Sequence, residues 1–231
     1  MKVYYRLANA PAGHRKLKLP TATKQHCLKN CIQEFGRTNI TVIGDRLDAA
    51  PTQMVEDLDL RLVPVNNGSG AATFRTALHL ALSENAPTDV VYLLEDDFLH
   101  KPGSKVYLLQ ALTAFPGHYV TLYDHPDKYM TNGPNPYVKL GGESTLLYRT
   151  ASSHWKKTNS TVMSFATSVA NLRQHRDLLE TYSQGSITDS FGLFCALAQY
   201  PLSTHVLSAV PGMSTHCELQ WLSPMTDWST I

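Results

Sequence analysis

Five consecutive apolar residues at positions 90–94 run directly into three carboxylates, Glu95, Asp96 and Asp97. A continuous apolar run of this length is typical of a strand that is buried on both faces, as in a parallel sheet. Three adjacent carboxylates cannot all be buried without partners, because each is costly to remove from water. We therefore expect the acids at the carboxyl end of a strand, facing a crevice and a cation, where ligands bind in open α/β sheets.

The first half of the chain alternates between two hydrophobic periods. Apolar residues at helical spacing, such as Cys27, Cys31 and Phe35, alternate with short apolar runs of the strand type. Loops are expected at 7–13 and at the turn cluster 66–70. The order β-α-β-α-β-α-β predicts a parallel sheet with right-handed crossovers. The predicted strands are 3–8, 40–45, 60–65 and 90–94, and the predicted helices are 20–35, 52–58 and 71–84.

The second half of the chain has a less regular pattern. It predicts a loop at 130–137, and it predicts that the tail at 211–216 ends as a loop. We expect one domain, 1–231, whose two halves (1–100 and 101–231) meet near residue 100. The predicted strands are 119–123, 206–210 and two antiparallel edge strands at 144–149 and 161–165, and the predicted helices are 104–115, 168–182 and 188–199.

Composition narrows the class of protein. With 43% hydrophobic and 17% charged residues, the 231-residue chain can bury a sizeable core. The net charge is +1 and no Lys/Arg run stands out, so we expect no nucleic-acid partner. No stretch has the apolar length of a membrane span and the first residues lack a signal-peptide pattern, which predicts a cytoplasmic protein. The four cysteines lack metal-finger spacing and are expected to be reduced thiols.

The three acids differ in the direction in which they point. Adjacent strand residues face opposite sides, so Glu95 and Asp97 point one way and Asp96 points the other. Where the strand ends, the backbone turns, and Asp96 can then reach a ribose or a base while Asp97 reaches a cation. Hard divalent cations prefer carboxylate oxygens and accept water and phosphate at the remaining positions. A solvated acidic turn without a ligand is the alternative.

The layout from Val3 to His216 resembles the nucleotide-sugar glycosyltransferases of the GT-A fold, because a βαβαβ half leads into an apolar strand and a D-x-D-like acidic triplet. It is most similar to the small soluble inverting transferases of large algal viruses and bacteria. Residues 211–216 resemble the tail of that group. The triplet departs from the motif in having no spacer residue. The resemblance implies a three-layer α/β/α fold with a mostly parallel central sheet and a smaller antiparallel acceptor-side portion. It also implies Mn²⁺ or Mg²⁺, a UDP-sugar donor of the glucose or rhamnose type, and a glycan or glycoprotein acceptor. A viral origin would imply the host cytoplasm.

The resemblance implies that 1–100 is the nucleotide-binding half and 101–231 the acceptor-binding half, and it assigns a donor side to the site. It implies that the loop Leu7, Ala8 and Asn9 cradles the base and ribose, that Asp45 hydrogen-bonds the base, and that Arg75 meets the phosphates near a helix N-terminus. Asp45 as a turn residue and Arg75 as a surface ion-pair partner are the alternatives. The same resemblance places Asp97 and His216 on the cation, with Glu95 and Asp96 beside the donor. A satisfied core or solvated role is the alternative for His216.

An acceptor side is implied in the same way. An inverting transfer needs a carboxylate that deprotonates the acceptor hydroxyl. Asp189 matches the family position of that base, although an N-cap role fits it equally well, and Asp124 is the second choice. The residues expected around the acceptor are Tyr123, His125, His154 and Trp155, although aromatic residues at strand ends are also ordinary core edges.

Other functions remain open at this point. A sugar-phosphate nucleotidyltransferase shares the sheet and the acidic metal ligand, but it needs a Gly-rich loop after the first strand, and residues 7–13 lack that pattern. A non-catalytic nucleotide- or glycan-binding module would have lost the carboxylate that acts as the catalytic base. A Rossmann dehydrogenase is disfavoured because no G-x-G-x-x-G follows the first strand.

Overall fold

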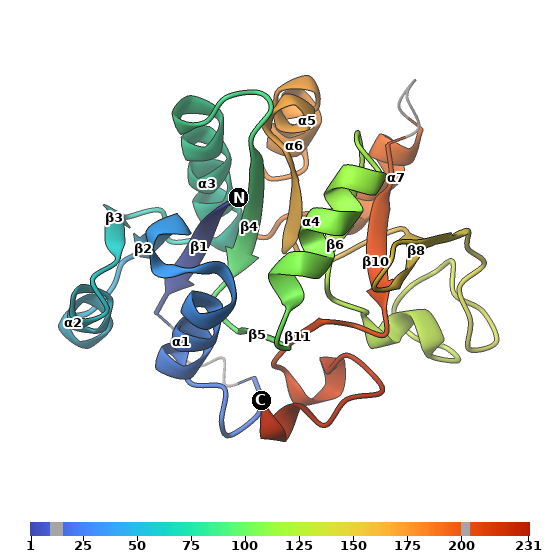
Figure 1. Cartoon of the computed structure of the whole chain (residues 1–231), viewed down its shortest axis with the longest axis horizontal. Helices are drawn as coiled ribbons and strands as arrows, with labels where there is room; N and C mark the ends of the chain where they lie inside the picture. Colours follow the sequence, from blue (N-terminus) through green and yellow to red (C-terminus); the bar gives the residue numbers. More distant parts are fainter. Residues whose placement is uncertain (10–15, 200–203) are drawn as a thin grey trace.

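A nine-stranded sheet runs through the protein between two layers of helices (Figure 1). The computed structural model describes residues 1–9, 16–199 and 204–231, so the predicted loop at 7–13 lies outside the described residues after Asn9. Strands follow the order β3-β2-β1-β4-β9-β6-β10-β8-β7. Their bounds are β1 Lys2–Ala8, β2 Ile40–Asp45, β3 Arg61–Val65, β4 Val90–Glu95, β6 Tyr119–Thr121, β7 Leu147–Arg149, β8 His154–Thr158, β9 Phe165–Ser168 and β10 Val206–Val210.

The first four strands form the predicted parallel half. β1 pairs in parallel with both β2 and β4, and β2 pairs in parallel with β3. β9 then pairs antiparallel with β4 and with β6, and β10 pairs antiparallel with β8. The sheet is therefore parallel from β3 to β4 and mixed beyond β4. This arrangement confirms the predicted α/β/α class with its antiparallel portion.

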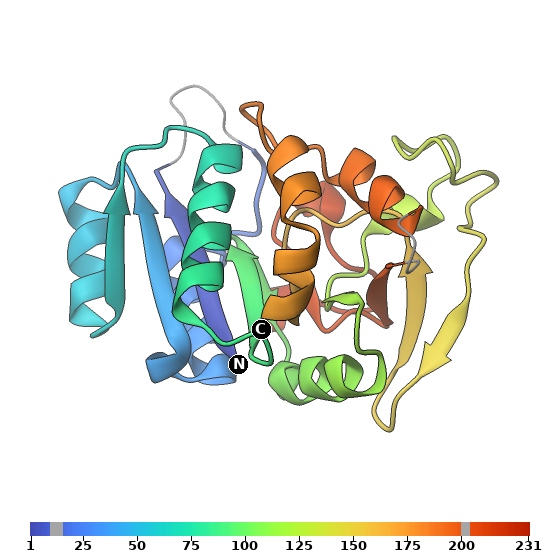
Figure 2. The same ribbon diagram turned by 90° about the horizontal axis from the view of Figure 1, so that it is seen from above.

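Helices cover both faces of the sheet, as Figure 2 shows for α3 and the α5–α6 pair on one face. Alternate strand residues divide the core. Tyr5 and Leu94 pack on the layer of α1, α2 and α4, whereas Tyr4 and Leu93 pack on α3 and α5–α7. Helix bounds are α1 Lys24–Phe35, α2 Ala49–Asp57, α3 Gly70–Glu84, α4 Ser104–Ala114, α5 Val169–Gln174, α6 Arg176–Thr181 and α7 Ser190–Ala198. Among the described residues, no helix has the length and apolar character needed to cross a membrane.

A second sheet was not expected from the sequence. It consists of β5 (Phe98–His100) and β11 (Ser214–His216), which pair antiparallel. The prediction that residues 211–216 form only a loop is therefore wrong for the last three of them. Each strand has three residues, too few to show a period, and their pairing depends on contacts between distant parts of the chain.

The edge strands and one helix also differ from prediction. The strand expected at 161–165 begins only at Phe165, and the one expected at 144–149 is reduced to Leu147–Arg149. β8 was not predicted, because its sequence places two adjacent lysines after a single tryptophan and shows no alternation of apolar and polar residues. The helix expected over 168–182 is two short helices that meet at His175, which ends α5 and precedes α6.

Candidate functional site

The acidic residues lie where β4 ends and the chain turns into β5. One ligand atom each from Glu95, Asp97 and His216 lies within 4.8 Å of the others. Nε2 of His216 is 3.0 Å from Oδ2 of Asp97. The three side chains are intermediate or buried in exposure rather than spread on the surface. We call them the metal-ligand cluster, because two carboxylates and an imidazole form a donor set that suits a divalent cation such as Mn²⁺.

The small sheet explains how His216 reaches this position from the far end of the sequence. β11 pairs with β5 in a register that places His216 opposite Phe98, the residue after Asp97. The next residue continues the pairing, since the Cys217 N–H donates to the Asp97 carbonyl over 2.9 Å. Figure 1 shows β5 and β11 side by side below the end of β4. The structure thus brings together the two residues that were predicted as metal ligands and adds Glu95.

The charges in this cluster are strongly coupled. Burial by itself raises the pKa of Asp97, but the His216 and Lys18 charges outweigh burial and hold that pKa below its usual value. Burial lowers the pKa of His216, but the negative charges of Asp97, Glu95 and Glu218 together outweigh burial and raise it. Burial raises the pKa of Glu95, and Arg6, whose Nη2 lies 3.4 Å from Oε1, acts in the opposite direction. The two carboxylates of the cluster are therefore balanced by cationic groups of the protein, Arg6 beside Glu95 and Lys18 beside Asp97.

Three lysines that the sequence interpretation did not use converge on the acids. Nζ of Lys18 lies 2.7 Å from Oδ2 of Asp97, and Nζ of Lys24 lies 2.6 Å from Oδ2 of Asp96. Lys16 forms an ion pair with Glu218, which is buried. The alternation of lysine at 16 and 18 was the available signal, and a short segment after β1 that holds cations beside acids suits a polyanionic ligand.

Backbone pairing holds residues 16–19, which we call the lysine segment, in place. The Leu19 N–H donates to the Cys217 carbonyl, and the Leu219 N–H donates to the Leu17 carbonyl, both over 2.9 Å. Lys18 forms a bridge with Glu218 in this antiparallel arrangement. β11 leads directly into residues 217–219, which pair with the lysine segment, so one stretch of chain fixes the positions of both His216 and Lys18.

The predicted cradle after β1 is only partly free to bind a ligand. The Leu7 side chain is fully buried in the core, so only its backbone can line a site. The Ala8 N–H donates to Oδ2 of Asp96 over 3.1 Å, which ties β1 to the acidic turn. Nδ2 of Asn9 donates to the Arg46 carbonyl over 2.6 Å. The assignment of these residues to a base and ribose stays a prediction.

Asp45 has a structural role in this structure. Its carboxylate is 4% exposed and accepts the N–H groups of Asn67 and Gly68 over 2.8 and 2.9 Å, as well as the Thr73 hydroxyl over 3.0 Å. Asp45 therefore holds the turn before α3. This is the turn-residue alternative, and a contact with a base stays untested.

Arg75 is also engaged by the protein. Its Nη1 donates to the Ser183 carbonyl at the end of α6. The guanidinium is thereby directed toward the α6–α7 connection. A role on the phosphates stays a prediction, and Lys18 and Lys24 contact the acidic turn more directly than Arg75 does.

Neither predicted base is free in this structure. Oδ1 of Asp189 accepts the Gly192 N–H over 2.8 Å and caps α7, while its side chain is exposed. Asp124 is 1% exposed and is held by Nζ of Lys156 at 2.9 Å and by the Tyr129 hydroxyl at 2.8 Å. Both carboxylates therefore stabilise the structure locally, and their assignment as bases stays a prediction.

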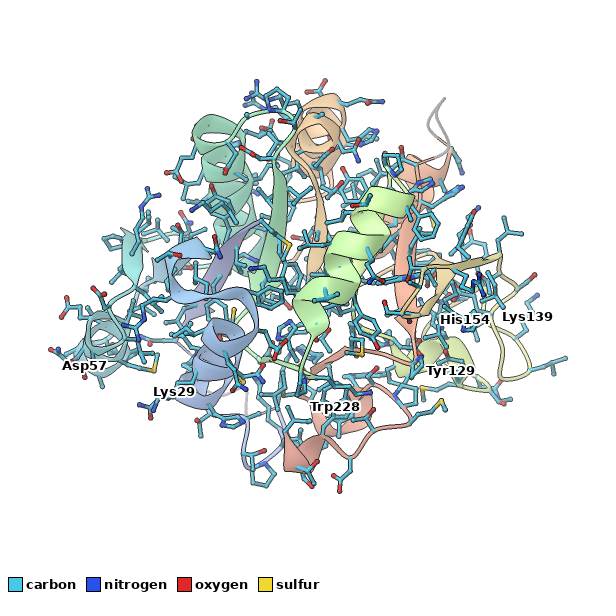
Figure 3. All side chains as sticks on the ribbon, in the orientation of Figure 1. Lys29, Asp57, Tyr129, Lys139, His154 and Trp228 are labelled. Carbon is cyan, nitrogen blue, oxygen red and sulfur yellow. The ribbon has the colours of Figure 1, made fainter. Side chains whose placement is uncertain are left out.

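The structure corrects part of the predicted acceptor surface. Trp155 is fully buried and donates its indole N–H to Thr150, and Tyr123 is 1% exposed, so neither ring is available to stack on a sugar. His154 is exposed at the start of β8, and Figure 3 shows it near the edge of the molecule that carries Lys139. Trp155 and Tyr123 were predicted as surface groups because the sequence did not show which strands are covered by other parts of the chain.

His125 is the predicted acceptor residue that lines a cavity. This cavity, which we call the Trp221 cavity, has a volume of about 340 Å³. Nδ1 of His125 lies 2.8 Å from Oδ1 of Asp127, and its ring lies 5.2 Å from that of Trp221. The sequence interpretation assigned no role to Asp127 or Trp221. The walls of the cavity include His125, Asp127, Asn135, Ser160, Phe191 and Trp221.

Comparisons with known proteins bear on the fold. No protein-family model matches the chain, and no curated protein matches its sequence. The crystal structure of GalNAc-T7 with UDP, GalNAc and Mn²⁺ aligns over 93% of this chain with a TM-score of 0.59 and 11% identity, and the chain spans 43% of its length. CMP:2-keto-3-deoxy-manno-octonic acid synthetase with CTP aligns over 91% of each chain with a TM-score of 0.51 and 14% identity. At such identities the likeness shows a shared fold.

Proposed function

We propose that this protein is a metal-dependent inverting glycosyltransferase that moves a sugar from a nucleoside-diphosphate donor to a hydroxyl of a glycan. The observation that supports this function is the metal-ligand cluster, with its ligand atoms within 4.8 Å of one another at the carboxyl end of β4. In open α/β sheets that end is the usual ligand-binding edge. A UDP-sugar of the glucose or rhamnose type remains the proposed donor, on the resemblance, and a cytoplasmic location remains proposed with it.

The residues present suit a divalent cation. Glu95, Asp97 and His216 would hold Mn²⁺ or Mg²⁺, and carboxylate oxygens with one imidazole are acceptable ligands for Mn²⁺ in particular. When bound, such an ion acts as a Lewis acid that stabilises charge on the leaving diphosphate. GalNAc-T7, which shares the fold, has been described with UDP and Mn²⁺.

Lysines of the chain add a second source of positive charge. In the free protein Lys18 neutralises Asp97 and Lys24 neutralises Asp96. We propose that the diphosphate draws both ammonium groups toward its oxygens. Lysine side chains are flexible point charges, so they can exchange one anionic partner for another without a change of backbone.

A second candidate is a sugar-phosphate nucleotidyltransferase. The specific observation in its favour is the set of lysines between the end of β1 and the start of α1, because such an enzyme needs basic residues for a triphosphate after its first strand. Lys16, Lys18 and Lys24 all contact acids near the cluster. The synthetase with CTP that shares the fold is consistent with this alternative.

Product analysis separates the two functions. The purified chain with Mn²⁺ is incubated with UDP-glucose or UDP-rhamnose, and UDP release is measured; in parallel it receives UTP or CTP with glucose 1-phosphate, and pyrophosphate release is measured. The proposed function predicts UDP release and no pyrophosphate. Pyrophosphate alone would establish the nucleotidyltransferase, and binding without turnover would indicate a non-catalytic module.

The variant Asp97→Asn tests the cluster itself. We expect it to lose metal-dependent UDP release and to bind UDP with Mn²⁺ at least tenfold more weakly in calorimetry, because one anionic ligand is removed. Asp57→Asn, on α2 at the far edge of the molecule in Figure 3, is the matched control. Wild-type affinity and turnover in Asp97→Asn would exclude Asp97 as a ligand.

A further inference from the structure

A group of large apolar side chains is exposed at the edge of the sheet that ends in β7. Of the large apolar side chains that are exposed among the described residues, half lie between residues 129 and 147. Leu140 is 94% exposed and Leu147 is 67% exposed. Single exposed apolar residues are ordinary on a protein surface, whereas a contiguous group marks an interaction site. We call this group the Leu140 patch, and it consists of Tyr129, Met130, Tyr137, Leu140, Leu146 and Leu147.

Contacts between separate segments of the chain make the patch continuous. The backbone of Gly141, next to Leu140, lies so close to residue 129 that a Cβ on Gly141 would be 3.3 Å from the Tyr129 carbonyl oxygen. Leu147 pairs with Lys156 across β7 and β8, and Nζ of Lys156 lies 4.2 Å from the centre of the Tyr129 ring. The patch is therefore one surface rather than a set of scattered residues.

The charged residues around the patch are almost all basic. Between residues 128 and 176 the sequence contains a single acid, Glu143. Its side chain is 8% exposed and forms an ion pair with a buried lysine. Lys139 and Arg149 are exposed, and Figure 3 shows Lys139 at the same edge of the molecule as Tyr129. The surface around the patch therefore presents positive charge to a partner.

Exposed leucines among basic residues are complementary to the surface of an anionic lipid bilayer. Aliphatic side chains bury themselves at the boundary between headgroups and acyl chains, and lysine and arginine attract acidic headgroups. Tyr129 and Tyr137 add rings with polar ends, which favour the same boundary. A second copy of this chain fits less well, because a two-fold interface would place the same basic residues of both copies close together.

We propose that the Leu140 patch is a membrane-docking surface that binds bilayers of anionic phospholipid. The leucines of the patch enter the headgroup region, while Lys139 and Arg149 pair with the lipid phosphates. Tyr137 stacks on Phe191 in the wall of the Trp221 cavity, with ring centroids 5.4 Å apart. Docking therefore holds that cavity close to the membrane surface.

The test is sedimentation of the purified full chain with lipid vesicles. Neutral vesicles contain phosphatidylcholine alone, and in anionic vesicles about a third of the lipid is phosphatidylglycerol. We expect the wild type to bind the anionic vesicles at least about tenfold more tightly than the neutral ones, and to lose most of this preference at high salt. Because neither donor nor metal is present, the result is independent of the proposed transfer reaction.

Two double variants separate the apolar contribution from the electrostatic one. Leu140→Ser with Leu147→Ser should weaken binding to anionic vesicles by about tenfold or more, because less aliphatic surface leaves water on docking. Lys139→Gln with Arg149→Gln should weaken it by about 25-fold, which is about fivefold for each lost charge, and should leave binding to neutral vesicles unchanged. All four side chains are exposed, so these substitutions leave the core intact.

A matched control carries Lys29→Gln and Val106→Ser, which change an exposed lysine of α1 and an exposed valine of α4. Figure 3 shows Lys29 far from Lys139. The control should bind vesicles as the wild type does. A wild type that does not bind anionic vesicles would overturn the proposal, as would equal losses in the control and in the patch variants.

Two further outcomes would assign the surface differently. Normal vesicle binding by the double leucine variant would mean that charge alone adsorbs the protein, and it would overturn docking through the patch. A wild-type dimer in light scattering that Leu140→Ser converts to a monomer would assign the patch to a second copy of the chain instead.

Discussion

The fully buried imidazole of His100 should make the protein less stable in acid. His100 ends β5 and is 0% exposed. Its Nε2 lies 3.1 Å from the Tyr92 hydroxyl, and its Nδ1 lies 3.3 Å from Oδ1 of Asn30. The Phe35 ring packs against its edge at 5.0 Å. The described residues around the ring therefore offer no carboxylate to compensate a charge, and burial lowers its pKa from 6.5 to about 3.

The magnitude follows from the difference between the two states. A histidine with a lowered folded pKa stays neutral in the native protein, while the unfolded chain takes up a proton below pH 6.5. Stability is therefore lost as the pH falls from the unfolded pKa toward the folded one. One pKa unit corresponds to about 1.4 kcal/mol, so at pH 5 this single group lowers the free energy of unfolding by about 2 kcal/mol relative to pH 8. The loss continues to about pH 3.

The assay is urea unfolding of the wild type and His100→Gln at pH 8 and pH 5. Glutamine keeps an amide near the Tyr92 hydroxyl but does not titrate. Its packing defect lowers stability at both pH values, so the informative quantity is the change between them. We expect the wild type to lose about 2 kcal/mol more than the variant on acidification. Equal losses, or an NMR titration in which the His100 ring protonates near pH 6, would refute the reasoning.

Two further substitutions probe the donor side. Lys18→Met should bind Mn²⁺ about several-fold more tightly, because it removes a cation 2.7 Å from Asp97. The same variant should bind UDP in the presence of Mn²⁺ about tenfold or more weakly, because one charge-assisted hydrogen bond to the diphosphate is lost. Calorimetry with and without UDP measures both affinities, and parallel changes in the two would argue against a phosphate role for Lys18. Asp45→Ala should lower the free energy of unfolding by about 2–4 kcal/mol, because the N–H groups of Asn67 and Gly68 lose their acceptor. Urea unfolding measures this loss, and a change below 1 kcal/mol, as an order-of-magnitude bound, would show that water replaces the carboxylate.

Some site residues could be located from nearby sequence, and others only from contacts between distant segments. The five apolar residues before Glu95 and Asp97 predicted correctly that these acids follow a strand, because a strand buried on both faces needs a continuous apolar run. Asp189 and Asp45 lie at a helix start and at a strand end, as predicted, but their residue type allowed either a ligand role or a structural one. The structural alternative was an N-cap for Asp189 and a turn residue for Asp45. The hydrogen bonds from Gly192 and Gly68 show those structural roles, which the sequence could not separate from ligand binding.

The sequence by itself determined the parallel half of the sheet, its flanking helices and the acidic strand end, since each depends on periodicity within a short window. Only the tertiary structure decided what faces those acids. The β5–β11 pairing brings His216 and the lysine segment to Asp97, and the ring contacts of Tyr123 bring His125 near them. It also decided that Trp155 is buried. Short strands and cavities are made by contacts between distant segments, and no local period encodes them.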